Sequence, residues 1–255
     1  KKASEMTRQE KLAALRSVIF LKKKRCGRIK ARLCADGRPQ RKLYQKSDAA
    51  SPTVKTESVL LTAVEEADEG RDVAVVDIPG AFLNAFLEEV VHMRLEGVVA
   101  DALIMIAPEV YGPMAEKNRA GLTILYVQLT RALYGCLKSS LRWYLQLSRV
   151  LQDEGFVENP YDSCVMNKDV NGSQCTICWH VDDLKISHKD PAVVDEILKT
   201  LTLIYGPLSV ERGRQHTYLG IDLDYRVDGK VSVSMIPYMQ EIVDKFPVDV
   251  TGRSA

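Results

Sequence analysis

The chain has 255 residues, of which 46% are hydrophobic, 27% charged and 7% aromatic, with 15 Gly and 10 Pro. This composition is ordinary for a folded domain and excludes disordered, collagen-like and coiled-coil chains. The net charge is only +1, but residues 1–46 contain 16 Lys or Arg against 3 Asp or Glu, whereas the other 209 residues contain 19 against 31. A basic segment of this kind is typical of a nucleic-acid contact or of a solvated tail, and charge alone leaves both open.

No stretch approaches the roughly 20 apolar residues of a membrane span, and the first residues lack the apolar run of a secretory signal. The sequence does not begin with Met, so we expect a segment of a longer polyprotein. Among the six cysteines only Cys175 and Cys178 have metal-like spacing. Because both lie in a strand-like run, buried thiols are favoured over a zinc site. We expect an intracellular protein in a reducing compartment, neither secreted nor membrane-bound.

The first half of the chain predicts mixed helices and strands. Apolar residues at 59, 60, 63, 64 and 67 mark one face of a helix. The run VAVVDI has β-branched strand character and must end at Pro79–Gly80. We expect a short helix over 9–21, a strand over 28–34, a helix over 57–69, strands over 73–78, 90–95 and 122–129, and an irregular excursion over 97–121.

The second half predicts hairpins between two strong helices. Asn171–Gly172 and Asp228–Gly229 are typical hairpin turns. Asp190–Pro191 combines an N-cap with a proline at the first helical position. We expect a helix over 140–154, strands over 163–168 and 174–187, a helix over 191–205, a hairpin over 216–235 and a short helix from Tyr238. This order favours an α+β fold over strict βαβ alternation.

Two acidic signals suggest chemistry. Asp77 ends a buried-looking strand, and Asp182 and Asp183 interrupt two apolar runs of strand character. Many hairpin tips carry Asp for turn geometry alone. However, three neighbouring carboxylates would raise one another's pKa, and a hard divalent cation with oxygen ligands would remove that cost. Two such ions can clamp the attacking and leaving oxygens of a phosphoryl transfer.

Nine sequence blocks carry a more specific signal. They are RIKARLCADGRPQR, SPTVKTESVLLTA, VVDIPGAFLN, LYVQLTRALYG, the helix with Trp143 and Tyr144, GFVENPYDSCVMN, WHVDDLKISH, HTYLGIDLDY and GKVSVSMIPYMQEIVDKF. In this order they resemble the reverse transcriptase domain of copia-type long-terminal-repeat retrotransposon Pol polyproteins. The resemblance covers nearly the whole chain after residue 28.

The resemblance implies an α+β right-hand polymerase fold. Its palm would be an antiparallel sheet backed by helices, with fingers, and with a thumb that is truncated or absent. The implied ranges are a basic arm and fingers over 1–50, palm over 51–84, fingers over 85–130, palm over 131–236 and the start of a thumb or connection over 237–255. The implied enzyme is a nucleotidyltransferase, an RNA-directed and DNA-directed DNA polymerase of a transposable element.

The resemblance also implies roles for single residues. Asp77, Asp182 and Asp183 would be the catalytic residues and the ligands of two Mg²⁺ ions, with Mn²⁺ as a substitute. The nucleotide-binding residues would be Lys30, Arg32, Gly80, Ala81, Phe82 and Gly135, with Phe82 as an aromatic gate against ribose. The primer-contacting residues would be His180, Tyr218, Leu219 and Gly220. His180 departs from the family, which commonly has Tyr at that position.

Each of these residues also has a structural interpretation. Phe82 alone would be taken as a core residue, and Lys30 with Arg32 as a solvated basic face. Because the two basic residues are two apart, a strand would point both to one side, where cations could meet a triphosphate.

The partners that the resemblance implies are an RNA or DNA template-primer and deoxynucleoside triphosphates. Integrase would lie upstream in the polyprotein and ribonuclease H downstream, with the protein in a cytoplasmic virus-like particle or in the nucleus. The alternative is a catalytically inactive nucleic-acid-binding remnant or a domain reused by its host. A two-metal nuclease or phosphatase is disfavoured, because no clustered His–Asp spacing occurs.

Overall fold

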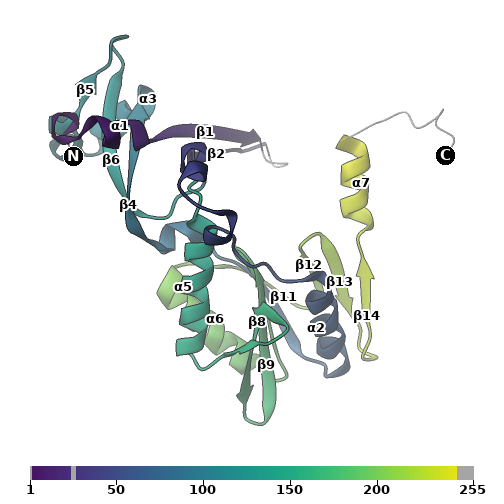
Figure 1. The fold of residues 1–255 in the computed structure, drawn as a ribbon. Helices are drawn as coiled ribbons and strands as arrows, with labels where there is room; N and C mark the ends of the chain where they lie inside the picture. Colours follow the sequence, from purple (N-terminus) through teal and green to yellow (C-terminus); the bar gives the residue numbers. More distant parts are fainter. Residues whose placement is uncertain (1, 24–26, 246–255) are drawn as a thin grey trace. The chain divides into compact units, whose positions relative to one another are not determined.

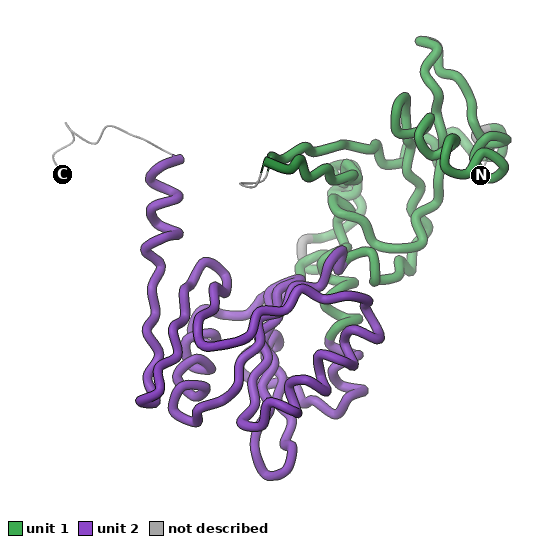
Figure 2. The backbone as a smooth tube through the Cα atoms, turned by 180° about the vertical axis from the view of Figure 1, so that it is seen from behind, with its two compact units in different colours: residues 1–51, 82–147 green, residues 52–81, 148–255 purple. Residues whose placement is uncertain are grey.

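The structure is a computed structural model that describes residues 2–23 and 27–245. The chain forms two compact units: residues 1–51 with 82–147 (unit 1), and residues 52–81 with 148–255 (unit 2) (Figure 2). The changes of unit after 51 and 81 lie close to the predicted domain limits at 50 and 84, whereas the change after 147 comes later than the predicted limit at 130. Residues 24–26 of the predicted arm and 246–255 of the predicted thumb lie outside the described residues.

Unit 1 is built on a sheet with the strand order β2-β1-β4-β6-β5 in its described part. The strands are β1 (Leu15–Lys23), β2 (Ile29–Ala35), β4 (Phe86–Glu96), β5 (Glu116–Lys117) and β6 (Thr123–Arg131). Among the described strands of this sheet, only the β1–β4 pair is parallel. The core lies where β4 and β6 pack against helix α3 (Val98–Ile106), and it includes Met93, Leu95 and Leu125. The far half of the β1–β2 hairpin is exposed, which leaves its basic side chains accessible.

Two predictions for unit 1 are wrong. The helix expected over 9–21 is only α1 (Arg8–Ala13), and the chain then turns into β1. The β-branched run Val18–Ile19 and pairing with β2 override the helical spacing there. The irregular excursion expected over 97–121 contains α3, α4 (Pro108–Tyr111) and β5. The predicted strand over 28–34 is confirmed as β2.

Unit 2 is built on an antiparallel sheet with the strand order β11-β3-β10-β9-β8-β7 in its described part. The strands are β3 (Asp72–Asp77), β7 (Val157–Asn159), β8 (Asp162–Val170), β9 (Ser173–His180), β10 (Asp183–His188) and β11 (Ser209–Arg212). The central strands β3, β9 and β10 are largely buried, as their apolar runs predict. Asn171 and Gly172 both have positive φ in the β8–β9 turn, which confirms the predicted hairpin.

Helices cover both faces of this sheet. Figure 1 shows α2 (Thr56–Asp68) on one side and α6 (Pro191–Tyr205) on the other. Helix α5 (Ser139–Asp153) runs across the change of unit at residue 147. A second sheet has the order β12-β13-β14, with β12 (Gln215–Tyr218), β13 (Ile221–Tyr225) and β14 (Val231–Ser234). Helix α7 (Ile236–Lys245) follows it.

These observations confirm the predicted helices over 57–69, 140–154 and 191–205 and the α+β class. The Asp190 side chain accepts a hydrogen bond from the amide of Ala192, as its N-cap position predicts. No helix among residues 2–23 and 27–245 is long and apolar enough to cross a membrane.

Asp162 anchors the start of α2 to the sheet. One carboxylate oxygen accepts hydrogen bonds from the Lys55 amide at 2.8 Å and the Ser58 hydroxyl at 2.6 Å. The other accepts from the Cys164 amide at 3.0 Å. Asp162 is buried, so these bonds offset the cost of removing its charge from water. The packing of α2 therefore depends on one acid from the block GFVENPYDSCVMN.

A buried ion pair holds α2 against β10. Lys185 of β10 pairs with Glu66 of α2, and both side chains are at most 1% exposed. Lys185 also donates to the Thr62 hydroxyl at 3.0 Å, and the Tyr225 hydroxyl of β13 donates to Glu66. Three elements that are distant in sequence thus meet at one charged network inside unit 2.

Candidate active site

Asp77 and Asp183 lie side by side at the ends of neighbouring strands. Asp77 is the last residue of β3, Asp183 is the first residue of β10, and the two are directly opposite in the antiparallel register. The Ile78 amide donates to the Asp182 carbonyl at 3.1 Å, which extends the pairing past the end of β3. Directly opposite side chains point to the same face of a sheet. The fold therefore brings together acids that are distant in the sequence.

The turn between β9 and β10 is strained. It consists of Val181 and Asp182, and Val181 has a φ of 59°. This left-handed conformation is costly for a β-branched residue and is normally left to Gly, Asn or Asp. The β8–β9 turn uses Asn171–Gly172 at the equivalent place. Strain at a turn that contains Asp182 and leads into Asp183 is a pointer to function.

Asp183 lies in an electrostatically unfavourable position beside the other two acids. Partial burial raises the pKa of Asp183, and repulsion from Asp182 and Asp77 raises it further, while His180 opposes the shift. Asp77 is exposed and the other two acids are half-buried, so all three are accessible to an ion. Within the described part of the chain, no three His, Cys, Asp or Glu side chains already form an arrangement that could hold a metal. The three acids are therefore an anionic group rather than a finished metal centre.

This electrostatic penalty predicts that Asp183→Asn stabilises the metal-free protein. Because the pKa of Asp183 is raised on folding, protonation favours the folded state, and the penalty is complete at pH values above the folded-state pKa. We expect Asp183→Asn to melt at a higher temperature than the wild type at pH 7 without divalent cations. The difference in melting temperature between the variant and the wild type should narrow as the pH falls toward 3.8, the ordinary pKa of an aspartate. Thermal denaturation across pH measures it, and a lower melting temperature for the variant at pH 7 would contradict it.

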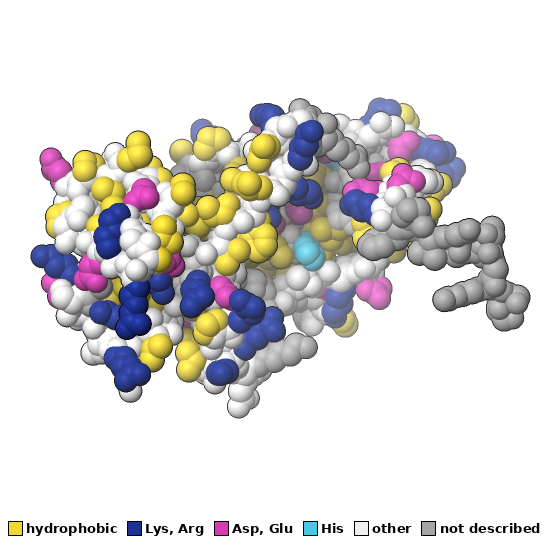
Figure 3. Space-filling model, turned by 90° about the horizontal axis from the view of Figure 1, so that it is seen from above, with side chains coloured by type: hydrophobic (Ala, Val, Ile, Leu, Met, Phe, Trp, Pro, Cys, Tyr) yellow, Lys and Arg dark blue, Asp and Glu magenta, His cyan; other side chains and the backbone are white. Residues whose placement is uncertain are grey.

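Unit 1 presents a basic face on the β1–β2 hairpin. Lys30 and Arg32 are exposed on β2, and the register places them opposite Lys22 and Phe20 of β1. The four side chains therefore share one face, as the spacing of Lys30 and Arg32 predicts. Figure 3 shows Lys and Arg side chains lying among exposed hydrophobic side chains on one face of the molecule.

An aromatic pair connects this face to the predicted gate. The Phe82 ring lies 4.7 Å from the Tyr134 ring at an interplanar angle of 50°. The Arg32 guanidinium lies over the Tyr134 ring, 5.0 Å from its centroid. Phe82 is half-buried rather than a core residue. Sequence analysis missed Tyr134, and its only signal was its place before Gly135 in the block LYVQLTRALYG.

Gly135 is required by packing within unit 1. It has a φ of 91°, and a Cβ there would lie 1.9 Å from the carbonyl oxygen of Ala35. The Ala35 amide also donates to the Tyr134 carbonyl at 2.7 Å. Gly135 thus packs closely against the end of β2. The nucleotide-binding role of Gly135 remains a prediction. Gly80, with a φ of 67°, lies in the turn after β3, and the buried Ala81 begins the short 3-10 helix Ala81–Asn84.

We expect Gly135→Ala to lower the free energy of unfolding of unit 1 by about 2–4 kcal/mol, because the methyl group adds a backbone overlap to left-handed strain. Gly121→Ala is the matched control, since Gly121 has a φ of 78° but open space around its Cβ position. That control should cost only about 1 kcal/mol. Chemical denaturation of both variants measures the difference, and equal losses would show that the Ala35 contact is irrelevant.

The predicted primer-contacting residues lie in unit 2. His180 ends β9 and is opposite Asp183, so it belongs to the same turn as the acids. Leu219 and Gly220 form the β12–β13 turn, with φ values of 54° and 78°. The Tyr218 side chain is only 1% exposed, so its ring is not a surface that a primer could contact. The sequence pattern around Tyr218 did not predict this burial.

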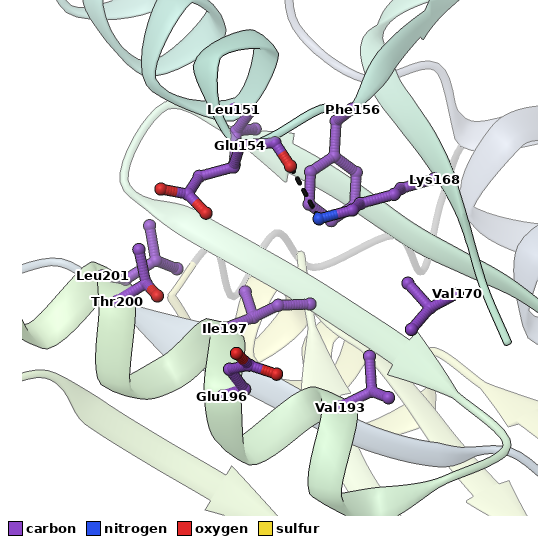
Figure 4. Close-up of a pocket in the computed structure, with 10 residues that line it drawn as sticks. All are labelled: Leu151, Glu154, Phe156, Lys168, Val170, Val193, Glu196, Ile197, Thr200 and Leu201. Atoms are coloured by element: carbon purple, nitrogen blue, oxygen red, sulfur yellow. Dashed lines mark hydrogen bonds between the residues drawn. The ribbon is translucent and has the colours of Figure 1, made fainter.

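Two other features carry no predicted chemistry. The pocket in Figure 4 lies between α6, β8 and the end of α5, and none of the predicted site residues lines it. Lys168 crosses it and donates to the Glu154 carbonyl at 2.7 Å. Cys175 and Cys178 are at most 1% exposed on β9, and burial raises the pKa of the Cys175 thiol to about 12. They are buried strand thiols, as favoured above.

Comparison with known proteins decides the family. A family model described as "Reverse transcriptase (RNA-dependent DNA polymerase)" matches residues 5–254. The chain belongs to this family. This reverse transcriptase-family chain is 26% identical over 217 residues to the Retrovirus-related Pol polyprotein from transposon RE1 of Arabidopsis thaliana, a match that covers 85% of the chain and 13% of that polyprotein. It is 26% identical over 247 residues to the Transposon Ty1-LR2 Gag-Pol polyprotein of Saccharomyces cerevisiae, covering 94% of the chain and 13% of that polyprotein.

The predicted copia-type reverse transcriptase family is thereby confirmed. The chain spans only about 13% of the length of these curated relatives. Among solved structures, apo telomerase from Candida tropicalis is similar with a TM-score of 0.47 and 10% identity, covering 89% of this chain and 50% of that one. Foamy viral protease-reverse transcriptase in complex with double-stranded DNA gives a TM-score of 0.44 and 15% identity, covering 94% of this chain and 33% of that one.

Proposed function

We propose that this reverse transcriptase-family chain synthesises DNA on an RNA or DNA template by adding deoxynucleotides to a primer 3′-hydroxyl. The observation that carries the proposal is the pairing of Asp77 with Asp183, next to Asp182, on the central strands of unit 2. The family match over residues 5–254 supports the same reaction class. On this proposal unit 2 is the palm and unit 1 the fingers.

The ligand chemistry of the three acids suits a site for hard divalent cations. Their chemistry is right, because carboxylate oxygens are preferred ligands of Mg²⁺. Their electrostatics are right as well, because burial and then repulsion from Asp182 and Asp77 raise the pKa of Asp183, and a nearby cation would favour its charged form. Asp77 and Asp182 would be the main ligands, with Asp183 completing the group. Two Mg²⁺ ions, when bound, would lower the pKa of the primer 3′-hydroxyl and stabilise the leaving pyrophosphate.

We assign the incoming nucleotide to residues of three kinds. Lys30 and Arg32 would contact the triphosphate, which charge-assisted hydrogen bonds favour. Phe82 would exclude a 2′-hydroxyl, and its contact with Tyr134 would hold the ring in one orientation. The backbone of Gly80 and Ala81 would approach the phosphates, since small residues permit this.

We assign the primer end to the two turns of unit 2. His180 ends β9 beside the acidic turn, opposite Asp183, and would pack near the primer terminus. The backbone of the half-buried Leu219–Gly220 turn would contact the primer strand. Gly135 remains a proposed nucleotide contact through its exposed backbone.

The polyprotein names of the relatives support a wider context for the chain. We propose that it works as part of a retrotransposon Pol polyprotein, with integrase upstream and ribonuclease H downstream, in an intracellular particle or the nucleus.

Primer extension tests the proposal. The protein is incubated with a DNA primer on an RNA or DNA template, the four deoxynucleotides, and Mg²⁺ or Mn²⁺. We expect extension that needs the divalent cation and that strongly prefers deoxynucleotides to ribonucleotides. Binding of the template-primer without any extension, in every cation tested, would reject the proposal.

That negative outcome would favour the alternative of a catalytically inactive nucleic-acid-binding domain. The basic residues 1–46 are the observation behind it. It predicts salt-sensitive binding, because neutralising phosphates releases counterions, and a loss of affinity when Lys22, Lys30 and Arg32 are replaced together.

A further inference from the structure

The two functional turns of unit 2 share an unusual backbone. Val181 in the β9–β10 turn and Leu219 in the β12–β13 turn both have φ values between 54° and 59°. A non-glycine residue in this region persists only where its surroundings over-determine it. The surroundings of these two turns include a shared contact, because a side chain at one turn bonds the main chain at the other.

That side chain is Tyr218, the last residue of β12. Its hydroxyl donates to the carbonyl oxygen of Asp183 at 3.2 Å, and the carbonyl oxygen of Cys178 lies at 3.4 Å. A hydroxyl has one proton, so the two acceptors share it. Burial raises the pKa of Tyr218 well above its ordinary value, which keeps the hydroxyl protonated as a donor.

We propose that Tyr218 is a positioning residue that couples the β12–β13 turn to the acid-bearing β9–β10 turn by hydrogen bonding to the main chain of Asp183. The inference rests on the proposed function above. The Leu219–Gly220 turn that would contact the primer is covalently next to Tyr218, and Asp183 is one of the three proposed catalytic acids. The bond therefore fixes the primer end relative to the acids, without Tyr218 touching either substrate.

Tyr225 supplies an internal control within the same sheet. It lies at the other end of β13, its side chain is also buried, and its hydroxyl donates to Glu66. It makes no recorded hydrogen bond to the β9–β10 turn among the described residues. Tyr225→Phe thus removes a comparable buried hydroxyl but leaves the contact with Asp183 intact.

The test compares Tyr218→Phe with Tyr225→Phe in single-nucleotide incorporation and in hydrogen exchange. Both variants keep the aromatic ring, and thermal melting checks that each is folded. We expect Tyr218→Phe to lower kcat about fivefold to tenfold, which is the worth of one hydrogen bond, with KM for the nucleotide unchanged. We expect the amides of 181–184 to exchange faster in Tyr218→Phe than in the wild type, without any substrate present.

Tyr225→Phe should lower the melting temperature at least as much but leave kcat within about twofold. Equal effects of the two variants on kcat, or unchanged exchange at 181–184 in Tyr218→Phe, would overturn the inference. Hydrogen exchange needs no activity, so it tests the coupling even if the wild type extends no primer. Failure of wild-type extension would instead count against the proposed function.

Discussion

Asp182→Asn should reduce primer extension at least about 1,000-fold while leaving the fold intact. Removing one carboxylate charge from the group of Asp77, Asp182 and Asp183 weakens the hold on divalent cations, and metal catalysis contributes several kcal/mol to such reactions. A loss of about 4 kcal/mol corresponds to about three powers of ten in rate. Single-turnover incorporation in Mg²⁺, with circular dichroism to verify folding, measures the effect.

Asp169→Asn is the matched control for this prediction. Asp169 lies beside a different hairpin turn of unit 2, the β8–β9 turn. There its carboxylate accepts a hydrogen bond from the Gly172 amide. The two turns lie at opposite ends of β9, so Asp169 is away from the proposed site. A general effect of losing a carboxylate at a turn would therefore appear in both variants. We expect Asp169→Asn to retain activity within about twofold. Extension that survives Asp182→Asn unchanged would contradict the assignment of the acids.

Glu66→Ala should be the most destabilising substitution discussed, lowering the free energy of unfolding by about 3–5 kcal/mol. The reason is that Lys185 would be left in the interior of unit 2 without its carboxylate partner, and the Thr62 hydroxyl alone does not replace that partner. Breaking one side of a buried ion pair costs far more than the pair itself contributes. Urea denaturation followed by far-ultraviolet circular dichroism measures the loss.

Two further variants separate this explanation from a general loss of charge. Glu241→Gln breaks an exposed pair with Lys245 on α7 and should cost at most about 0.5 kcal/mol. The double variant Glu66→Leu with Lys185→Met removes both buried charges and should recover most of the loss. A double variant as unstable as Glu66→Ala would show that shape, and not charge, governs this site.

The three acids could be identified from the sequence, but their proximity in the fold could not be predicted from it. Asp77 was identified because it ends an apolar β-branched run, and Asp182 and Asp183 because they interrupt another. Their register depends on the pairing of β3 with β10, which no local pattern encodes. It was the resemblance to a known family that connected these signals before the structure did.

The elements that were mispredicted had ambiguous local signals. Residues 15–21 have helical spacing, yet their β-branched and aromatic side chains suit the exposed hairpin with β2 that they form. The helix α3 has the sequence VVADALIMI, in which every residue except Asp101 is apolar, so the sequence gives no clear amphipathic period. Elsewhere the elements were predicted correctly because the sequence has strong cap and turn signals, as at Asp190 and at Asn171–Gly172.

The supporting residues were invisible to sequence reasoning. Lys185 follows the acidic pair and was indistinguishable from a surface lysine until its burial against Glu66 was seen. Tyr134 and Tyr225 belong to blocks that marked the family but carried no individual signal. Such contacts join elements distant in the chain, so packing rather than local propensity determines them.

The most direct test of the central claim is anomalous diffraction from crystals of the protein with template-primer, an incoming deoxynucleotide and Mn²⁺. The account predicts Mn²⁺ bound by the carboxylates of Asp77 and Asp182, next to Asp183 and the triphosphate. Mn²⁺ bound elsewhere, with these three carboxylates contacting no ion while the nucleotide is present, would contradict it.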